Sequence, residues 1–378
     1  MTTLRVVVDQ IVAPVPGGIG RYAAELTREL INTAPDGCDV AGIVSAQPQE
    51  NYEALTRQLP GLARFEKAPF ARRELSRAWQ FGLPVTPGGG MIHAPSLLAP
   101  LRRHDRLSDG EQVTVTVHDV VPWTHPETMT PQNVGWHKAM LKRATKFADG
   151  IVVPTHAVAD QLAHLADFGE RVRVIGGAPA STLVEPSDAD ERAKALGLPQ
   201  DYILTVASLE PRKGLTPLIT ALSLPDAPDL PLVVVGPPAW GELTVAQVVD
   251  ELGLDASRVL VLGTISDADL AVALSRATMF VFPSLAEGFG LPIVEAFRFG
   301  VPVIHSDDPA LVEVGGEAGL VVERDKPKGY PERLALAMSQ LAGDTALSER
   351  LGVFGIDRAR AFSWRDSAER VWQLHADM

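Results

Sequence analysis

The densest group of residues able to do chemistry lies at positions 282–307, FPSLAEGFGLPIVEAFRFGVPVIHSD. Apolar residues at 279–282 predict a strand, and Glu287 opens a glycine-rich loop. A helix should follow, because Pro292 suits a first helical turn and Gly300 the position just past a helix end. Glycines let backbone N–H groups approach a ligand closely, and a helix N-terminus favours negative charge. This strand–loop–helix therefore predicts a diphosphate site.

Two glutamates of this segment suit partners other than phosphate. A carboxylate at Glu287 would repel phosphate, so it should accept hydrogen bonds from sugar hydroxyls. Glu295, one turn into the helix, could reach ribose hydroxyls, as an acidic residue does in dinucleotide-binding folds. Glycine, proline and spacing alone leave an alternative open, a purely structural turn with solvated glutamates.

A basic pair follows another predicted strand, at 202–206. The sequence LEPRKG at 209–214 places Arg212 and Lys213 at a helix start. Guanidinium, ammonium and helix N-terminus together would clamp a diphosphate. The alternative is a solvated basic turn.

Two segments of the first half also follow predicted strands. GGIGRY at 17–22 supplies a glycine turn, and VHD at 117–119 places His118 and Asp119 at a strand end. A tight βα turn and a structural histidine are the alternatives to binding roles.

The elements that must position these residues alternate between strand and helix. First-half strands are expected at 4–8, 40–44, 113–117 and 151–153, with helices near 19–33, 133–147 and 156–166. Second-half strands are expected at 202–206, 232–235, 259–262, 279–282 and 301–304. This alternation predicts an α/β fold with parallel sheets and ligands at the carboxyl ends of the strands. The turn-rich stretch 176–191 is expected to link two lobes.

These motifs together resemble glycosyltransferase family 4, the retaining enzymes of GT-B fold. The E-x7-E pattern of Glu287 and Glu295, the EGFGLP core and the GVPVI strand carry the resemblance, with GGIGRY, VHD and EPRKG. It implies two Rossmann-like lobes whose parallel sheets face each other across a cleft. Residues 1–183 would form the acceptor-binding lobe, with a returning helix at 362–378, and residues 198–361 the donor-binding lobe.

The resemblance also assigns roles to individual residues. Catalytic roles are implied for His118, Glu287, Arg212 and Lys213. Donor contacts are implied for Gly18, Gly263, Thr264, Ile265, Gly288, Phe289, Gly290, Leu291 and Glu295. The acceptor side would include Asp119, Arg21 and Tyr22.

The activity implied is retaining transfer of a hexose from a nucleoside-diphosphate sugar to a glycan or lipid-linked acceptor, in cell-wall or polysaccharide biosynthesis. Mannose and GDP-mannose are favoured. The resemblance implies a front-face mechanism, in which the leaving diphosphate helps to deprotonate the acceptor, and neither a metal nor another cofactor. A sugar-nucleotide epimerase and a non-catalytic sugar-nucleotide-binding protein remain alternatives. A dinucleotide oxidoreductase is disfavoured, since no strand precedes a clean G-x-G-x-x-G with an acidic residue about 20 positions on.

Two D-x-D strings, at 188–190 and 267–269, could suggest a metal site. Each follows a serine, Ser187 or Ser266, at an expected helix start. Serine caps helices and carboxylates favour the helix N-terminus, so capping is predicted instead.

Composition sets the remaining limits. The chain has 378 residues, 46% hydrophobic and 21% charged, which fits a globular protein of two domains. The net charge of −13 argues against nucleic acid as a general partner. One cysteine, no long apolar run and no signal-like start predict a cytoplasmic enzyme.

Basic residues gather at two places in the first half: Arg64, Lys67, Arg72, Arg73 and Arg77, then Arg102, Arg103 and Arg106. Solvated faces are expected there. The alternatives are contact with an anionic acceptor or with the inner face of the membrane.

Overall fold

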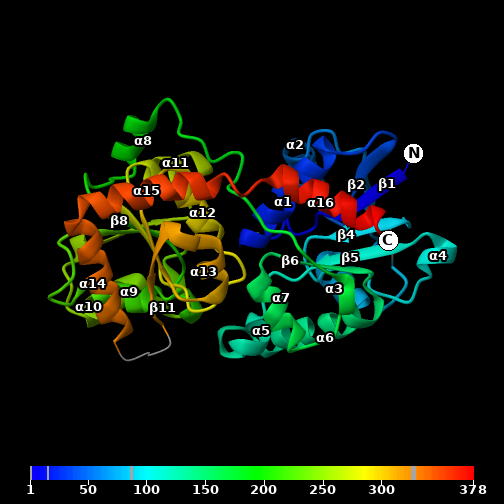
Figure 1. Cartoon of the computed structure of the whole chain (residues 1–378). Coiled ribbons are helices and arrows are strands. Elements are labelled where there is room, and N and C mark those ends of the chain that lie inside the picture. The colour runs from blue at the N-terminus through cyan, green and yellow to red at the C-terminus, as the bar shows by residue number, and fades with distance from the viewer. Residues whose placement is uncertain (1, 15–16, 86–87, 325–328) are drawn as a thin grey trace. The chain divides into compact units, whose positions relative to one another are not determined.

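The computed structural model describes residues 2–14, 17–85, 88–324 and 329–378. It divides into two compact units (Figure 1). One contains the chain up to Gly177 together with Ser363–Met378, and the other is Ala178–Phe362. Ala180 and Leu183 are fully buried in the core of the second unit, which therefore begins earlier than the sequence pattern suggests.

The first unit is built on one parallel sheet. Within the described residues it has seven strands in the order β3-β2-β1-β4-β5-β6-β7. The strands are β1 (Thr2–Val7), β2 (Cys38–Val44), β3 (Arg64–Lys67), β4 (Met91–Ala94), β5 (Gln112–Thr116), β6 (Gly150–Val153) and β7 (Val172–Val174). The helices are α1 (Gly17–Asn32), α2 (Gln49–Gln58), α3 (Arg72–Gln80), α4 (Arg106–Asp109), α5 (Val121–Thr124), α6 (Pro131–Phe147), α7 (His156–Ala163) and α16 (Trp364–Ala376).

The last helix, α16, belongs to this first unit. Ser363 caps it by accepting a hydrogen bond from the Asp366 N–H at 3.2 Å. Trp372 then donates its indole N–H to the carbonyl of Leu30 in α1, at 3.1 Å. Buried indoles need such a partner, so this bond fixes α16 along α1.

The second unit has a similar plan. Its main sheet, in the described residues, has six strands in the order β12-β9-β8-β13-β14-β15. The strands of the unit are β8 (Ile203–Val206), β9 (Leu232–Val235), β10 (Ala239–Trp240), β11 (Leu243–Thr244), β12 (Val259–Gly263), β13 (Met279–Phe282), β14 (Val303–Ser306) and β15 (Gly319–Val322). The helices are α8 (Ala189–Ala195), α9 (Leu215–Leu222), α10 (Val245–Glu251), α11 (Asp267–Ser275), α12 (Leu291–Arg298), α13 (Pro309–Gly315), α14 (Tyr330–Gly343) and α15 (Thr345–Ala359).

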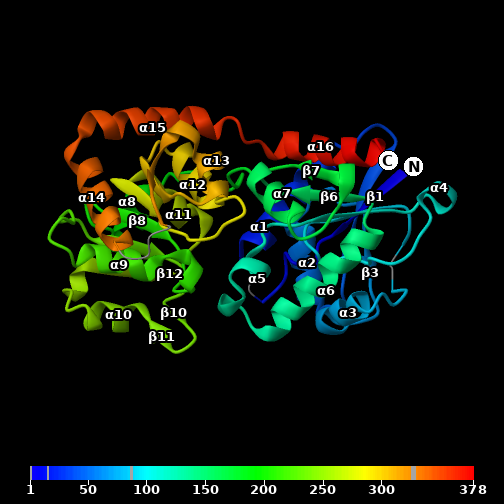
Figure 2. The same ribbon diagram turned by 60° about the horizontal axis from the view of Figure 1, so that its bottom comes forward.

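In both sheets the strand order reverses once. The reversal falls between β1 and β4 in the first sheet and between β8 and β13 in the second. Helices cover both faces of each sheet, as Figures 1 and 2 show. At such a reversal the loops after neighbouring strands diverge to opposite faces and leave a crevice at the carboxyl edge, where α/β proteins bind ligands.

Six strands of the described residues were not among those expected from sequence: β3, β4, β7, β10, β11 and β15. The most consequential is β4, since no strand was expected around Met91. It is instead a central strand that pairs with both β1 and β5. It therefore brings the residues after it, from Pro95 onward, to the carboxyl edge of the first sheet.

Candidate functional site

The strand-order reversal of the second unit brings Arg212, Lys213 and Glu287 together. A short 3-10 turn, Pro211–Lys213, follows β8, and the glycine-rich loop follows the neighbouring strand β13. Lys213 Nζ lies 2.6 Å from Glu287 Oε1, and Arg212 Nη1 lies 3.6 Å from Glu287 Oε2. Arg212 Nε also pairs with Glu210 at 2.7 Å. The predicted basic pair and the predicted glutamate thus form one ion-paired cluster.

The backbones of the two loops hold this cluster in place. The carbonyl of Arg212 accepts the Leu285 N–H at 2.6 Å, and the Ser284 hydroxyl lies 2.9 Å from the same oxygen. Gly214 has a φ of +68°, and a Cβ there would collide with the carbonyl oxygen of Pro283. Close approach of the two loops therefore requires glycine at this position.

The three side chains of the ion-paired cluster are mostly buried. The Glu287 side chain is 11% exposed, against 22% for Lys213 and 17% for Arg212. Burial alone would raise the pKa of Glu287, but Lys213 and Arg212 outweigh burial and lower that pKa. From sequence, Glu287 was expected to act separately from the two cations. In the structure it forms ion pairs with both, and Glu210 adds a second carboxylate at Arg212, so an incoming phosphate would compete with Glu287 for Lys213.

The glycine-rich loop leads into α12 as the sequence predicted. Gly290 occupies the N-cap of α12 with a φ of +87°, and Pro292 lies in its first turn. Phe289 is 8% exposed and packs edge-on against Phe362, with ring centroids 5.5 Å apart. Phe289 therefore presents backbone rather than side chain to the loop surface. Glu295 is 3% exposed, within the buried face of α12.

The remaining donor-side residues lie on the same edge of the sheet. The loop residues Gly288 and Leu291 flank Phe289 and Gly290. Gly263 ends β12 and accepts the Gly236 N–H from the end of β9 at 2.9 Å. Thr264 and Ile265 follow it, before α11. The structure thus places these three predicted donor-contact residues, which end or follow β12, two strands away from β8 and the cation cluster.

Two residues of this edge were not predicted. The Ser284 hydroxyl lies 2.7 Å from Glu287 Oε1. Asp308 follows β14 and caps α13 by accepting the N–H groups of Ala310 and Leu311, and burial raises its pKa to about 6. Asp followed by proline after a strand is a helix-start signal, so Asp308 could have been found from sequence.

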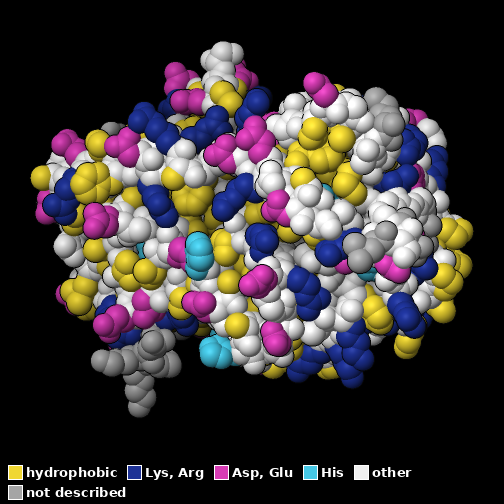
Figure 3. All heavy atoms as spheres, turned by 45° about the vertical axis from the view of Figure 1, so that its right-hand side comes forward, with side chains coloured by type: hydrophobic (Ala, Val, Ile, Leu, Met, Phe, Trp, Pro, Cys, Tyr) yellow, Lys and Arg dark blue, Asp and Glu magenta, His cyan; other side chains and the backbone are white. Residues whose placement is uncertain are grey.

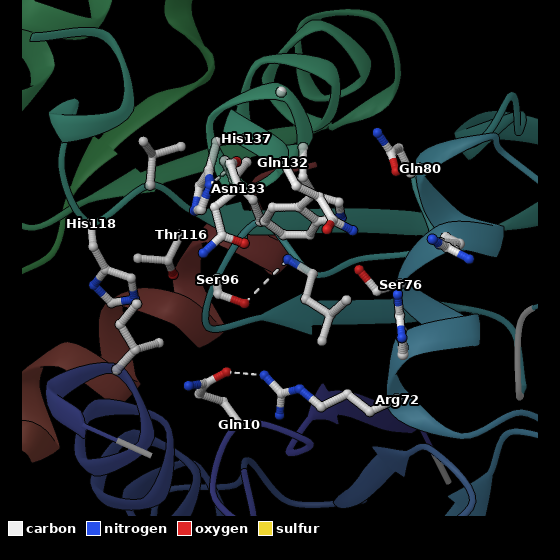
Figure 4. A pocket seen from close by; sticks show the side chains of 18 of the residues that line it. Gln10, Arg72, Ser76, Gln80, Ser96, Thr116, His118, Gln132, Asn133 and His137 are labelled. Atoms are coloured by element: carbon white, nitrogen blue, oxygen red, sulfur yellow. Dashed lines mark hydrogen bonds between the residues drawn. The ribbon is translucent and has the colours of Figure 1, made fainter. Parts of the chain in front are cut away.

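In the first unit, a cavity of about 770 Å³ opens at the carboxyl edge of the sheet (Figure 4). Residues after β1, β4 and β5 line it, together with side chains of α3 and α6. The lining is Gln10, Ile19, Arg72, Arg73, Ser76, Arg77, Gln80, Ser96, Leu97, Leu98, Thr116, Val117, His118, Asp119, Gln132, Asn133, Gly135, Trp136 and His137.

The surroundings of His118 at this cavity define its tautomer and its charge. Its Nε2 lies 2.7 Å from the carbonyl oxygen of Pro95, and the Tyr22 ring meets it edge-on at 4.7 Å. Burial lowers the pKa of His118, although the Pro95 carbonyl and Asp119 oppose the shift. A carbonyl can only accept, so Nε2 carries the proton and Nδ1 of the neutral ring is left as a hydrogen-bond acceptor.

The other predicted residues of this unit differ in exposure. Asp119 accepts the Val121 N–H at 3.0 Å and so shapes the loop before α5. Tyr22 is 3% exposed and packs behind His118, against Trp364. Gly18 is exposed in the first turn of α1, and Arg21 is half-buried one turn later.

The basic residues of the two predicted groups have different surroundings in the structure. Arg64 approaches Asp39 at 3.6 Å, and Lys67 lies over the Tyr52 ring at 3.9 Å, so these two are internally paired. Arg102 pairs with Glu111 at 3.2 Å. The arginines of α3 instead line the cavity, whereas Arg103 and Arg106 border a more open hollow with Lys146 and Arg171.

The D-x-D strings are engaged by arginines. Ser266 caps α11 as predicted, accepting the Asp269 N–H at 3.1 Å. The expectation for Ser187 is wrong: α8 begins one residue later, with Asp188 at its N-cap and no side-chain capping bond. Arg192 pairs with both Asp188 and Asp269 at 2.8 Å, while Asp190 pairs with Arg276 at 2.6 Å.

None of the described helices is both long and apolar enough to cross a bilayer.

Comparison with known proteins gives two family matches. Residues 16–177 match the family described as Glycosyltransferase Family 4, and residues 187–352 match Glycosyl transferases group 1. O-antigen chain mannosyltransferase B of Escherichia coli is 29% identical over 288 residues, which cover 73% of this chain and 71% of that protein. The serotype-specific mannosyltransferase WbdA of E. coli is 28% identical over 66% of this chain, but the match covers 32% of its own length.

Two solved structures illustrate the same fold. Sucrose-phosphate synthase of Thermosynechococcus elongatus has a TM-score of 0.75 and 22% identity, over 100% of this chain and 99% of its own. HepE of Anabaena, in complex with UDP and glucose, has a TM-score of 0.76 and 18% identity over the whole of both chains. The TM-scores establish the fold of the chain, which is GT-B. At identities this low, the two structures show the fold alone.

Proposed function

Because this chain belongs to the family 4 glycosyltransferases of GT-B fold and is a hexosyltransferase, we propose that it moves a hexose from a nucleoside-diphosphate sugar to a glycan or lipid-linked acceptor, with retention of configuration. The observation that carries the donor assignment is the cluster of Arg212, Lys213 and Glu287 at the strand-order reversal of the second sheet. It combines two cations, a carboxylate and an adjacent helix N-terminus at one edge of the sheet.

Each component of the cluster has a chemical task in such a transfer. As the bond to the sugar breaks, negative charge develops on the departing diphosphate. Arg212, Lys213 and the N–H groups of residues 288–290 stabilise that charge. Glu287, released from Lys213 when phosphate arrives, accepts hydrogen bonds from the hydroxyls of the donor sugar. The nucleoside is held by residues 263–265 and Glu295.

Retention follows from a front-face route. A double displacement would need two carboxyl groups about 5 Å apart, one as nucleophile. In this cluster Glu287 is assigned to the sugar hydroxyls, and the other carboxylate, Glu210, is paired with Arg212, so neither is assigned as a nucleophile. The leaving diphosphate therefore takes the acceptor proton on the same face, and Nδ1 of neutral His118 is available in the first unit to accept a hydrogen bond from a sugar hydroxyl. No metal is required, because Arg212 and Lys213 supply the positive charge.

Mannose is the favoured sugar, with GDP-mannose as donor. The support is the naming of two relatives as mannosyltransferases. The HepE complexes contain UDP and glucose, so UDP-glucose is the natural competitor in a test.

The test is an acceptor screen with purified nucleotide sugars. GDP-mannose and UDP-glucose are each incubated with and without α-mannoside acceptors, in EDTA, and free nucleoside diphosphate is measured. We expect release that depends on the acceptor and a product whose new bond keeps the donor's anomeric configuration by NMR. An isomerised nucleotide sugar would favour an epimerase instead, and activity that returns only with Mn²⁺ or Mg²⁺ would refute metal independence.

A further inference from the structure

Helix α3 turns a polar face into the cavity of the first unit. Leu75, Ala78 and Trp79 are buried and pack into the core. The polar residues of α3 that line the cavity are Arg72, Arg73, Ser76, Arg77 and Gln80. The amphipathic period therefore directs three guanidinium groups of one short helix toward a single cavity.

The three arginines are not equivalent. Arg72 donates to the carbonyl of Asp9 at 2.7 Å and also bonds the side chain of Gln10, so it is part of the cavity wall. Arg73 and Arg77 have no hydrogen bond or ion pair through their side chains to any described residue. They stand four residues apart on an exposed helix face, where like charges repel and destabilise the helix. An anion between them would remove that repulsion.

The opposite wall is neutral. Figure 4 shows Gln132, Asn133 and His137 of α6 across the cavity from the α3 side chains, and Figure 2 shows the two helices side by side. Trp136 of the same helix also lines the cavity, and its indole N–H is buried with no hydrogen-bond partner among the described residues. Amides and an amphipathic indole suit the hydroxyls and the apolar face of a sugar.

One carboxylate, Asp119, is found among the described lining residues, and it already accepts the Val121 N–H. The cavity is therefore positively charged at α3 and neutral at α6. Figure 3 shows several Lys and Arg side chains gathered toward the lower edge of the face drawn there, so positive charge is a feature of the surface in that view.

We propose that the acceptor of this enzyme carries a phosphate group, bound by Arg73 and Arg77, while its sugar lies against Trp136 and Asn133. The inference rests on the proposed function, because it names the acceptor class of the transferase. Two guanidinium groups match the double charge and several acceptor oxygens of a phosphate, whereas one guanidinium satisfies a carboxylate. A cavity of about 770 Å³ has room for a sugar and its phosphate.

Calorimetry without donor tests the site directly. Mannose 1-phosphate and methyl α-mannoside are titrated into the wild type, the double variant Arg73→Gln/Arg77→Gln and the control Arg57→Gln. Arg57 is an exposed arginine of α2 outside the cavity. We expect the wild type and the control to bind mannose 1-phosphate at least about tenfold more tightly than the mannoside, and the double variant to lose that preference. A wild type without preference, or a double variant that keeps it, would overturn the proposal.

Further probes identify the source of the phosphate. A decyl-diphosphate-linked mannose that binds more tightly than mannose 1-phosphate assigns the phosphate to a lipid-linked acceptor, and the reverse assigns it to a free sugar phosphate. A methyl glucuronide that binds as tightly as mannose 1-phosphate overturns phosphate as the recognised group.

Transfer assays separate this proposal from the proposed function. In the double variant, kcat/KM should fall at least about tenfold more for a phosphorylated than for a neutral acceptor. Equal losses for both acceptors would refute the phosphate site while leaving the transferase activity established. If the wild type prefers mannose 1-phosphate in calorimetry but transfers no sugar from any donor, the proposed function fails and the anion site stands.

Discussion

At the scale of single residues, the cation cluster makes a quantitative prediction about the donor. Lys213→Ala and Arg212→Ala should each weaken binding of a nucleoside diphosphate by about 1.5–3 kcal/mol, the range for charge-assisted hydrogen bonds. Calorimetry with GDP measures the effect. Lys194→Ala, which removes an exposed lysine of α8, is the matched control and should change nothing. Unchanged affinity in both cluster variants would reject the phosphate assignment.

Replacing the carboxylate of the same cluster should leave GDP binding nearly unchanged and lower kcat. Glu287→Gln keeps a polar side chain near Ser284 but removes the charge that holds Lys213 at 2.6 Å. Affinity for GDP, which has no sugar, should therefore not fall by more than about threefold, or 0.7 kcal/mol. If Glu287 binds the sugar more strongly in the transition state, kcat should drop by at least about 100-fold. A parallel loss of GDP affinity would place Glu287 in the phosphate site instead.

Sequence alone could not have ranked the basic residues. Arg64 and Arg73 both lie in charged, exposed segments, and their spacing to neighbouring charges is similar. What separates them is the ion pairs that the fold supplies: Asp39 on the adjacent strand and Glu66 on its own strand for Arg64, and none in the described residues for Arg73. A partner brought from a distant part of the chain has no local signal, so the arginine-lined cavity was not predictable.

At the scale of elements, local signals did predict the strand, glycine loop and helix at 279–298. Pro292 and Gly300 indicate the start and the end of that helix through local backbone preferences, which do not depend on tertiary packing. The strand β4 was missed because four residues after a glycine run carry little periodicity, and its central position comes from pairing with β1 and β5. Ser187 failed as a cap for a related reason, since Arg192 and Arg276 engage the carboxylates beside it from other positions.

The contact between the β8 and β13 loops gives an element-scale prediction. Gly214→Ala should destabilise the second unit by at least about 2 kcal/mol, because the left-handed backbone and the clash with Pro283 both oppose a Cβ. GDP binding should weaken as the cluster is displaced. Gly343→Ala, in α14, meets nothing within 4 Å and is the control for a neutral substitution. Denaturation curves and calorimetry decide the matter, and wild-type values for Gly214→Ala would show that the two loops need no glycine.

At the scale of the whole molecule, the end of the chain is tied to the first sheet through buried histidines. His375 of α16 lies 2.9 Å from Gln112 through Nδ1 and 3.1 Å from Thr114 through Nε2. The hydroxyl of Thr114 lies 2.8 Å from Nδ1 of His93 on β4. Burial lowers the pKa of His375 to about 4, and burial together with the nearby His375 lowers the pKa of His93 to about 3. Both rings must therefore stay neutral for α16 to remain docked.

These lowered pKa values predict how stability depends on pH. Above pH 6.5, the ordinary value, both histidines are neutral whether the chain is folded or unfolded. As the pH falls from 6.5 toward 4, the unfolded chain binds protons that the folded chain does not. The free energy of unfolding of the first unit should then fall by up to about 1.4 kcal/mol per pH unit for each histidine.

The variant His375→Gln isolates one of these contributions. Glutamine can still form hydrogen bonds but does not titrate, so between pH 7.5 and 5.0 the variant should lose about 2 kcal/mol less stability than the wild type. Urea unfolding followed by tryptophan fluorescence suits the measurement, because five of the six tryptophans, all except Trp240, lie in the first unit. His164→Gln, at an exposed histidine after α7, should retain the wild-type pH dependence. Equal losses in the wild type and His375→Gln would mean that His375 is protonated in the folded protein, and that docking of α16 does not depend on its neutral form.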